Sequence, residues 1–242
     1  MRYKYCEVEN FEDFACGRVI YHKSHMPSFP VRLANEIFRR CLEYIDIDSN
    51  IILFDPCCGG GYMLTVLGLL NPHTIGRIIC TDIDEEAISL AKSNLSLLTI
   101  EGLLNRRQEI KNMIIKYNKQ SHIEALKSTD KFIENIKQCS FQPDVRCLTA
   151  DALNYELLYK IDVKPDIVIA DVPYGNLVSW SNISNNAVNL LLDSIYYVLH
   201  TNTVIAIIYD KSQRIRNEKY KRLERFKAGK RIIEILKMAE VL

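Results

Sequence analysis

A short apolar run leading into a glycine-rich turn sets the strongest limit on the fold. Residues 51–54 (IILF) are apolar without alternation, as in a strand that is buried on both faces of a parallel sheet. Residues 55–61 (DPCCGGG) follow directly, and apolar residues then recur at helical spacing over 64–70. This order of strand, tight turn and helix predicts the opening unit of an α/β sheet, whose ligands bind at the carboxyl end of the first strand.

The alternation of strand-like and helix-like segments continues along the chain. Helical spacing covers 31–44 and 85–97. Further strands are predicted at 77–81, 144–149, 166–170, 203–209 and 230–241. We therefore expect one domain over 1–242 with the α/β fold, built on a doubly wound, mostly parallel, Rossmann-like sheet.

Two parts of the chain lie outside this alternation. The N-terminal segment (1–48) begins with 30 residues that show no regular pattern. A helix-rich, polar stretch at about 99–142 has too few Gly and Pro residues for a loop of its length. We predict that it is an insert of two or three helices that forms a cap on the sheet.

Composition limits the surroundings of the protein. No run of about 18 apolar residues occurs and the N-terminus is charged, so we expect a cytoplasmic protein without membrane contact. The eight cysteines are scattered and form no C-x-x-C pair, which favours reduced core thiols and no metal site. No exposed apolar stripe stands out, so a monomer is expected.

The turn over 55–61 favours one class of cofactor. It lacks the G-x-x-x-x-G-K-[ST] pattern of a triphosphate site. It also begins with Asp55, whose carboxylate would repel a pyrophosphate but suits a ligand that carries an ammonium and a sulfonium. The turn therefore predicts binding of S-adenosylmethionine, with S-adenosylhomocysteine as the product.

Three further acids follow the ends of predicted strands. Asp82 ends the second strand, where a carboxylate can accept hydrogen bonds from both hydroxyls of a ribose. Asp84 could assist it or could be a helix cap. Asp151 follows the third strand and could accept from an adenine amino group or act as another N-cap. Their joint pattern indicates a nucleoside cofactor.

The catalytic candidates are Asp171, Pro173 and Tyr174, in the motif 171–175 (DVPYG) after an apolar strand. A planar nitrogen is a weak nucleophile, and Asp171 with the backbone carbonyl of Val172 could accept its hydrogen bonds. Pro173 shapes the turn, and Tyr174 offers a ring for stacking of a flipped base. No nucleophilic thiol is required, so Cys57 and Cys58 are interpreted as turn residues.

A basic segment is the candidate RNA surface. Residues 211–231 hold ten Lys or Arg against two Glu in a chain of net charge +1. The candidate RNA-binding residues are Lys211, Arg214, Arg216, Lys221 and Arg222; a solvated helix face is the alternative. Arg32 could reach RNA or the cofactor carboxylate, or could pair with Glu36 at i,i+4.

These motifs resemble those of a known family. Residues 55–61 are similar to the D-P-x-C-G-S-G motif of RNA base methyltransferases, and 171–175 to their [ND]-x-P-Y-G motif. More closely, 29–34 (FPVRLA), 64–70 (LTVLGLL) and 210–212 (DKS) resemble the avilamycin-resistance rRNA methyltransferases, and the likeness runs over nearly the whole chain.

The resemblance implies methylation of a guanine nitrogen in large-subunit (23S) rRNA, free or within the ribosomal subunit, and resistance to orthosomycin antibiotics. It implies that Asp82 binds the ribose, that Asp151 binds the adenine, and that Asp171 and Tyr174 face the target base. The methionine and ribose end of the cofactor would be lined by Asp55, Cys57, Gly59 and Gly61.

Two other functions fit the residues. The same site could methylate a protein amide, a small amine or DNA; the basic segment argues against the first two. Alternatively, the chain could be a cofactor-binding module that has lost its chemistry and binds RNA. The intact Asp171 and Tyr174 speak against that alternative.

Overall fold

A computed structural model describes residues 2–24, 26, 28–139, 142–172 and 186–240. The strands are β1 (Ile51–Asp55), β2 (Ile75–Asp82), β3 (Asp144–Thr149), β4 (Ile167–Asp171), β5 (Val204–Asp210), β6 (Tyr220–Ala228) and β7 (Arg231–Met238). They form one sheet in the order β3-β2-β1-β4-β5-β7-β6. The first five strands are parallel, while β7 is antiparallel to both β5 and β6. The prediction of a mostly parallel α/β sheet is confirmed.

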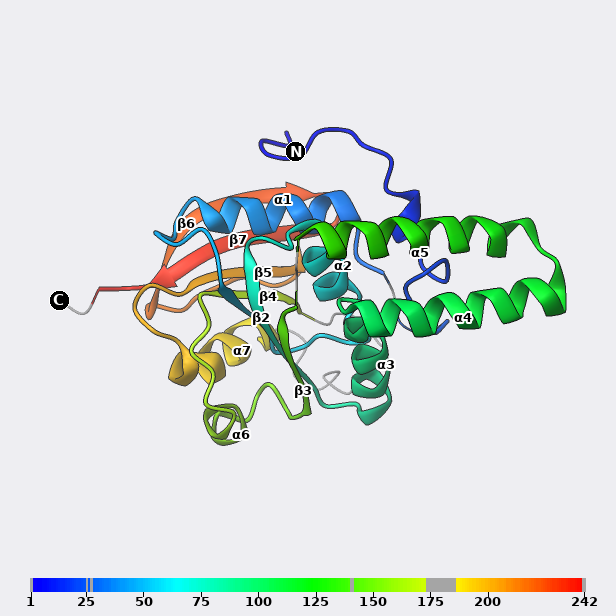
Figure 1. The fold of residues 1–242 in the computed structure, drawn as a ribbon. Coiled ribbons are helices and arrows are strands. Elements are labelled where there is room, and N and C mark those ends of the chain that lie inside the picture. Colours follow the sequence, from blue (N-terminus) through cyan, green and yellow to red (C-terminus); the bar gives the residue numbers. More distant parts are fainter. Residues whose placement is uncertain (1, 25, 27, 140–141, 173–185, 241–242) are drawn as a thin grey trace.

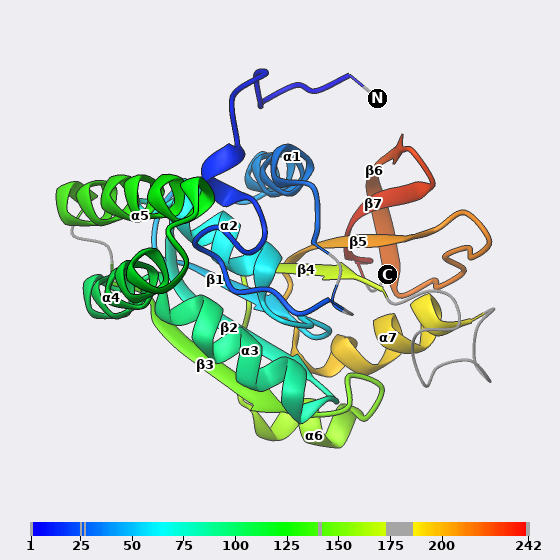
Figure 2. The same cartoon turned by 90° about the vertical axis from the view of Figure 1, so that its right-hand side faces the viewer.

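The helices cover both faces of the sheet (Figures 1 and 2). On one face, the core joins the strands to α1 (Val31–Leu42), α2 (Tyr62–Leu70) and α3 (Glu85–Ser96). On the other face lie α6 (Tyr155–Lys160), α7 (Ala187–Ile195) and the 3-10 helix η3 (Tyr196–Val198). Alternate residues of one strand serve opposite faces: Ile167 and Ile169 face the first core, and Val168 and Ala170 the second. Burial on both faces explains why these strands are continuous apolar runs.

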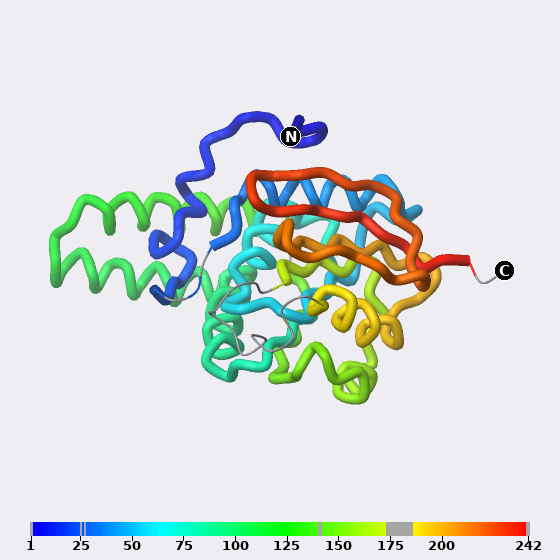
Figure 3. The backbone as a smooth tube through the Cα atoms, turned by 180° about the vertical axis from the view of Figure 1, so that it is seen from behind, coloured from blue at the N-terminus to red at the C-terminus, as the bar shows by residue number. Residues whose placement is uncertain are grey.

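The inserted helices form a hairpin rather than a cap on the sheet. Helices α4 (Ile100–Tyr117) and α5 (Gln120–Cys139) pack mainly on each other and project beyond the edge of the domain (Figures 1 and 3). The base of the hairpin joins the first core through Leu103, Phe132 and Ile136. The prediction that the insert caps the sheet is therefore wrong. Its buried apolar residues pack between the two helices and at the base of the hairpin rather than over the sheet.

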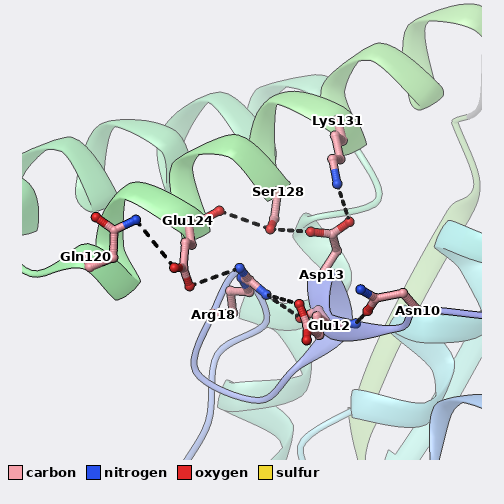
Figure 4. A network of polar contacts seen from close by, with 8 residues as sticks. All are labelled: Asn10, Glu12, Asp13, Arg18, Gln120, Glu124, Ser128 and Lys131. Atoms are coloured by element: carbon pink, nitrogen blue, oxygen red, sulfur yellow. Dashed lines mark hydrogen bonds and ion pairs between the residues drawn. The ribbon is translucent and has the colours of Figure 1, made fainter.

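The N-terminal segment holds this hairpin in place. It contains the 3-10 helix η1 (Glu12–Phe14), and Asp13 accepts hydrogen bonds from Ser128 Oγ at 2.5 Å and Lys131 Nζ at 2.9 Å on α5 (Figure 4). Arg18 reaches Glu124 of the same helix at 3.2 Å. These contacts tie α5 to the N-terminal segment.

None of the described helices is long and apolar enough to cross a membrane.

Candidate functional site

Acidic side chains gather at the edge where the parallel strands end. An aspartate stands at the last position of β1, β2, β4 and β5, and another lies two residues after β3: Asp55, Asp82, Asp171, Asp210 and Asp151. The sequence predicts that four of these, all but Asp210, belong to one site. The structure brings those four together, since all four carboxylates act electrostatically on the thiol of Cys57.

The glycine-rich turn is shaped by two of these acids. Asp55 Oδ1 accepts a hydrogen bond from Cys57 N at 2.9 Å, and Asp82 Oδ2 accepts one from Gly59 N at 2.8 Å. Gly61 has a φ of 71° at the start of α2, and a Cβ there would lie 3.0 Å from the Cα of Ala91 on α3. The turn therefore requires glycine both for its backbone angle and for its close approach to α3.

The part of the site around Asp55 and Cys57 is short of positive charge. Asp55 is 2% exposed, and burial raises its pKa well above the ordinary value, assisted by the charges of Asp82 and Asp171. Burial, together with the surrounding carboxylates, also raises the pKa of Cys57, so its thiol stays protonated. Buried carboxylates that repel one another favour a cationic ligand, because the cation lowers the cost of their ionisation. The arrangement fits a ligand with ammonium and sulfonium groups.

The side chains of two predicted cofactor residues accept hydrogen bonds from backbone N–H groups two positions further along the chain. Asp84 is exposed, and its Oδ1 accepts from Glu86 N at 2.8 Å, so it caps α3 as the alternative reading held. Asp151 Oδ1 accepts from Leu153 N at 2.9 Å, whereas Asn154 is the N-cap of α6. The N-cap alternative for Asp151 is therefore wrong. Binding of the cofactor by either acid stays a prediction.

Asp171 lies at the centre of the edge, at the end of β4. Burial raises the pKa of its carboxyl to about 6, and Arg231 opposes that rise. Arg231 Nε lies 3.8 Å from Asp171 Oδ2. The next residue, Val172, donates its N–H to Ile208 O at 2.8 Å, which holds the strand end against β5. Pro173 and Tyr174 lie outside the described residues.

The basic candidates do not share one place. Lys211 follows the end of β5 at the acidic edge, but Lys221 and Arg222 pair with Lys237 and Leu236 near the opposite end of the sheet. Ala228 lies six positions after Arg222 along β6, which is a distance of about 20 Å. All five predicted residues are exposed: Lys211, Arg214, Arg216, Lys221 and Arg222. Their binding of RNA stays a prediction.

The alternative interpretation of 211–231 as a solvated helix face is wrong, because its second half is the edge strand β6 and the start of β7. Its turn places Lys227, Lys230 and Arg231 at the acidic edge, opposite the end of β5. These three residues are not among the predicted RNA-binding residues. The charge count of the segment indicates that basic residues gather there. Only the strand register shows which of them lie at the acidic edge.

Arg32 is held by the N-terminal segment. Its Nη2 donates to Cys6 O at 2.8 Å, and its guanidinium lies 3.8 Å from the centre of the Tyr3 ring. The alternative, a pairing of Arg32 with Glu36, is wrong, because Glu36 accepts from Arg40 at 2.7 Å instead. A contact of Arg32 with RNA or cofactor stays a prediction.

Among the described residues, no group of three or more His, Cys, Asp or Glu side chains is arranged to hold a metal ion.

Known proteins share this fold and sequence pattern. Residues 1–231 match the family model described as rRNA methyltransferase AviRa. A 23S rRNA (guanine(2535)-N(1))-methyltransferase of Streptomyces viridochromogenes is 36% identical over 233 residues, which cover 95% of this chain and 93% of that protein. The solved structure of rRNA methyltransferase AviRa from the same organism superposes with a TM-score of 0.87 at 35% identity, covering 96% and 94% of the two chains. TrmN of Thermus thermophilus shares the fold alone, with a TM-score of 0.52 at 15% identity over 88% of this chain and 50% of that one.

Proposed function

The chain belongs to the AviRa family of rRNA methyltransferases, and from this premise we propose that it transfers a methyl group from S-adenosylmethionine to N1 of a guanine in 23S rRNA. The full-length similarity to the Streptomyces enzyme named for that reaction carries the proposal. The same proposal includes resistance to orthosomycin antibiotics of the avilamycin type, because a methyl group added to rRNA can block a drug that binds there.

The acidic edge supports the choice of methyl donor. S-adenosylmethionine supplies an electrophilic methyl group on a sulfonium, and its ammonium adds a second positive charge. In our proposal Asp55, Cys57, Gly59 and Gly61 line its methionine and ribose end. Asp82 accepts from the ribose hydroxyls with the lone pairs that Gly59 N and Asp84 N leave free, and Asp151 accepts from the adenine amino group.

Replacing Asp82 by alanine is expected to weaken binding of S-adenosylmethionine by about 10- to 100-fold, since hydrogen bonds to a charged group contribute about 1.5–3 kcal/mol. Titration calorimetry with S-adenosylmethionine measures this change. Asp144→Ala is the matched control, because Asp144 is exposed and pairs with Arg77 near the opposite end of the sheet. Its affinity should equal that of the wild type, and an equal loss in both variants would contradict the separate roles.

Asp171 is the proposed proton acceptor. Guanine N1 carries a proton in the neutral base, and that proton must leave before the lone pair on N1 can form a bond. A carboxylate with a pKa of about 6 is ionised at neutral pH and is still basic enough to accept it. The carbonyl of Val172 adds a second acceptor. Pro173 shapes the turn and Tyr174 stacks on the base in this proposal.

The kcat/KM for methyl transfer is expected to fall as the pH is lowered through about 6, because the raised pKa of Asp171 leaves its carboxyl protonated below that value. Each further pH unit should remove about nine-tenths of the ionised form. A profile of kcat/KM from about pH 5 to pH 8 tests this. A flat profile to the acid limit would contradict the role of Asp171 as a base.

The proposed function is tested by offering radiolabelled S-adenosylmethionine with total rRNA, ribosomal subunits, duplex DNA and a protein extract in parallel reactions. Label in large-subunit rRNA is the expected result. Label in protein or DNA would replace the substrate and keep the methyltransferase. Binding of the methyl donor with no transfer to any acceptor would favour a cofactor-binding module without chemistry.

A further inference from the structure

Arg231 and Asp171 lie side by side without forming a hydrogen bond to each other. Their nearest atoms, Arg231 Nε and Asp171 Oδ2, are 3.8 Å apart, which is longer than a hydrogen bond. In the part of the chain that the structure describes, neither Arg231 Nε nor Asp171 Oδ1 has a hydrogen-bond partner, although both atoms are buried. Each such atom costs about 1–3 kcal/mol, so a donor and an acceptor left together in this way point to a ligand that contacts both.

Strand pairing and an aromatic ring position the guanidinium of Arg231. Arg231 begins β7 directly opposite Asp210, the last residue of β5. Its guanidinium carbon lies 5.1 Å from the centre of the Phe29 ring, and Phe29 is buried just before α1. About a quarter of each side chain of the Arg231–Asp171 pair is exposed, so a base can approach it.

The pair matches one edge of guanine. On that edge the N1–H donor lies beside the O6 acceptor, so a carboxylate and a neighbouring guanidinium can bind both at once. Adenine presents the opposite order, with N1 as acceptor beside an amino donor. Enzymes that modify a base commonly read this edge of a nucleotide turned out of its stack.

We propose that Arg231 is a catalytic residue whose guanidinium donates to O6 of the target guanine while Asp171 accepts the N1 proton. The pair thereby selects guanine over adenine. This inference rests on the proposed function and names the group that stabilises the reacting base.

The proton and electron balance explains why a cation is needed at O6. As the N1–H proton passes to Asp171, its electron pair remains on N1 and is shared with O6. The N1–carbon bond then forms while the carbon–sulfur bond breaks, and the electron pair of that bond stays on sulfur. The products are 1-methylguanine and S-adenosylhomocysteine, and Asp171 releases the proton to solvent. A preorganised donor at an oxygen that gains charge contributes about 10²- to 10³-fold in rate.

Arg231→Ala is expected to lower the single-turnover rate of methyl transfer to large-subunit rRNA by about 10²- to 10³-fold, with unchanged affinity for S-adenosylmethionine in calorimetry. Arg231→Lys keeps the charge and should lose less. Guanidinium chloride should partly restore Arg231→Ala, whereas the same concentration of sodium chloride should not. The loss should also shrink as the pH rises toward ionisation of guanine N1 itself. Arg77→Ala is the matched control, because Arg77 pairs with Asp144 near the opposite end of the sheet.

The outcomes separate this inference from the proposed function. Active wild type with an equally active Arg231→Ala would overturn the role of Arg231 and leave the function standing. Wild type that transfers no label to rRNA would overturn both. If Arg231→Ala fails to fold or to bind the methyl donor, the single-turnover rate of Arg231→Lys is measured instead. A loss of rate in Arg231→Lys that does not change with pH would assign Arg231 a structural role.

Discussion

Asp171→Asn is expected to lower single-turnover methyl transfer by about 10²- to 10⁴-fold while leaving affinity for S-adenosylmethionine unchanged, because it removes a base that must accept a proton. Asparagine has almost the same shape as aspartate and still offers one oxygen as a hydrogen-bond acceptor. It cannot take the N1 proton of guanine. Rates are measured with enzyme in excess over large-subunit rRNA, and affinity by calorimetry.

The same variant separates two target atoms. An exocyclic amine keeps a second proton and needs an acceptor chiefly to orient it, so a carboxamide oxygen could serve. A ring N1–H must be deprotonated, so asparagine should fail. Activity of Asp171→Asn close to that of the wild type would therefore contradict methylation at N1 and favour an amino group. Asp171→Ala removes the acceptor altogether and should be inactive for either target.

Glu36→Gln is expected to lower the free energy of unfolding by about 3–5 kcal/mol, as for loss of one partner of a buried ion pair. Glu36 is fully buried on α1 and accepts hydrogen bonds from the backbone N–H groups of Lys4, Tyr5 and Cys6 at 2.7–3.0 Å. It also accepts from Arg40 Nε at 2.7 Å. The amide of glutamine would oppose at least one of these donors and leave Arg40 short of a negative charge.

Urea denaturation measures this change, and Glu12→Gln is the control because Glu12 is exposed and pairs weakly with Arg18 at 3.9 Å. The control should change stability by less than about 1 kcal/mol. Burial alone would raise the pKa of Glu36, but the backbone donors and Arg40 outweigh it and lower the pKa. Its stabilisation is therefore present above the unfolded value of about 4.3 and is lost as the pH falls through the lower folded value. Equal stability of Glu36→Gln and wild type would contradict this account.

The parallel part of the sheet could be read from the sequence because burial on both faces leaves continuous apolar runs. The predicted strand 144–149 matches β3, and Asp84 was correctly considered as the cap of α3. The glycine-rich turn was recognisable because its backbone angles and its contact with α3 both demand glycine. In each case the signal lies within a short stretch of sequence.

The edge strand β6 could not be read in the same way. Its register shifts between Arg222 and Glu224, so the alternation of apolar and charged residues is interrupted. The choice of Arg40 over Arg32 as partner of Glu36 was equally hidden, since both lie four residues away on α1. Arg32 binds the backbone of Cys6, whereas Arg40 also binds Arg2 O and Glu224 of β6. These partners come from distant parts of the chain.

The proposed catalytic role of Arg231 depends on tertiary structure as well. The charge count of 211–231 shows an excess of basic residues but does not distinguish among them. Pairing of β7 with β5 places Arg231 beside Asp171, while Lys221 and Arg222 fall near the opposite end of the sheet. A residue becomes part of the site here through strand register, which no local pattern encodes.

Analysis of the methylated nucleoside tests the central proposal most directly. Large-subunit rRNA labelled by the wild-type protein is digested to nucleosides, and the labelled product is compared with 1-methylguanosine and N2-methylguanosine by chromatography and mass spectrometry. We predict that the label is 1-methylguanosine and that it blocks primer extension at one 23S rRNA position, since a methyl group on N1 prevents base pairing. Label in another nucleoside, or rRNA that stays unlabelled under conditions in which the protein binds S-adenosylmethionine, would contradict the account.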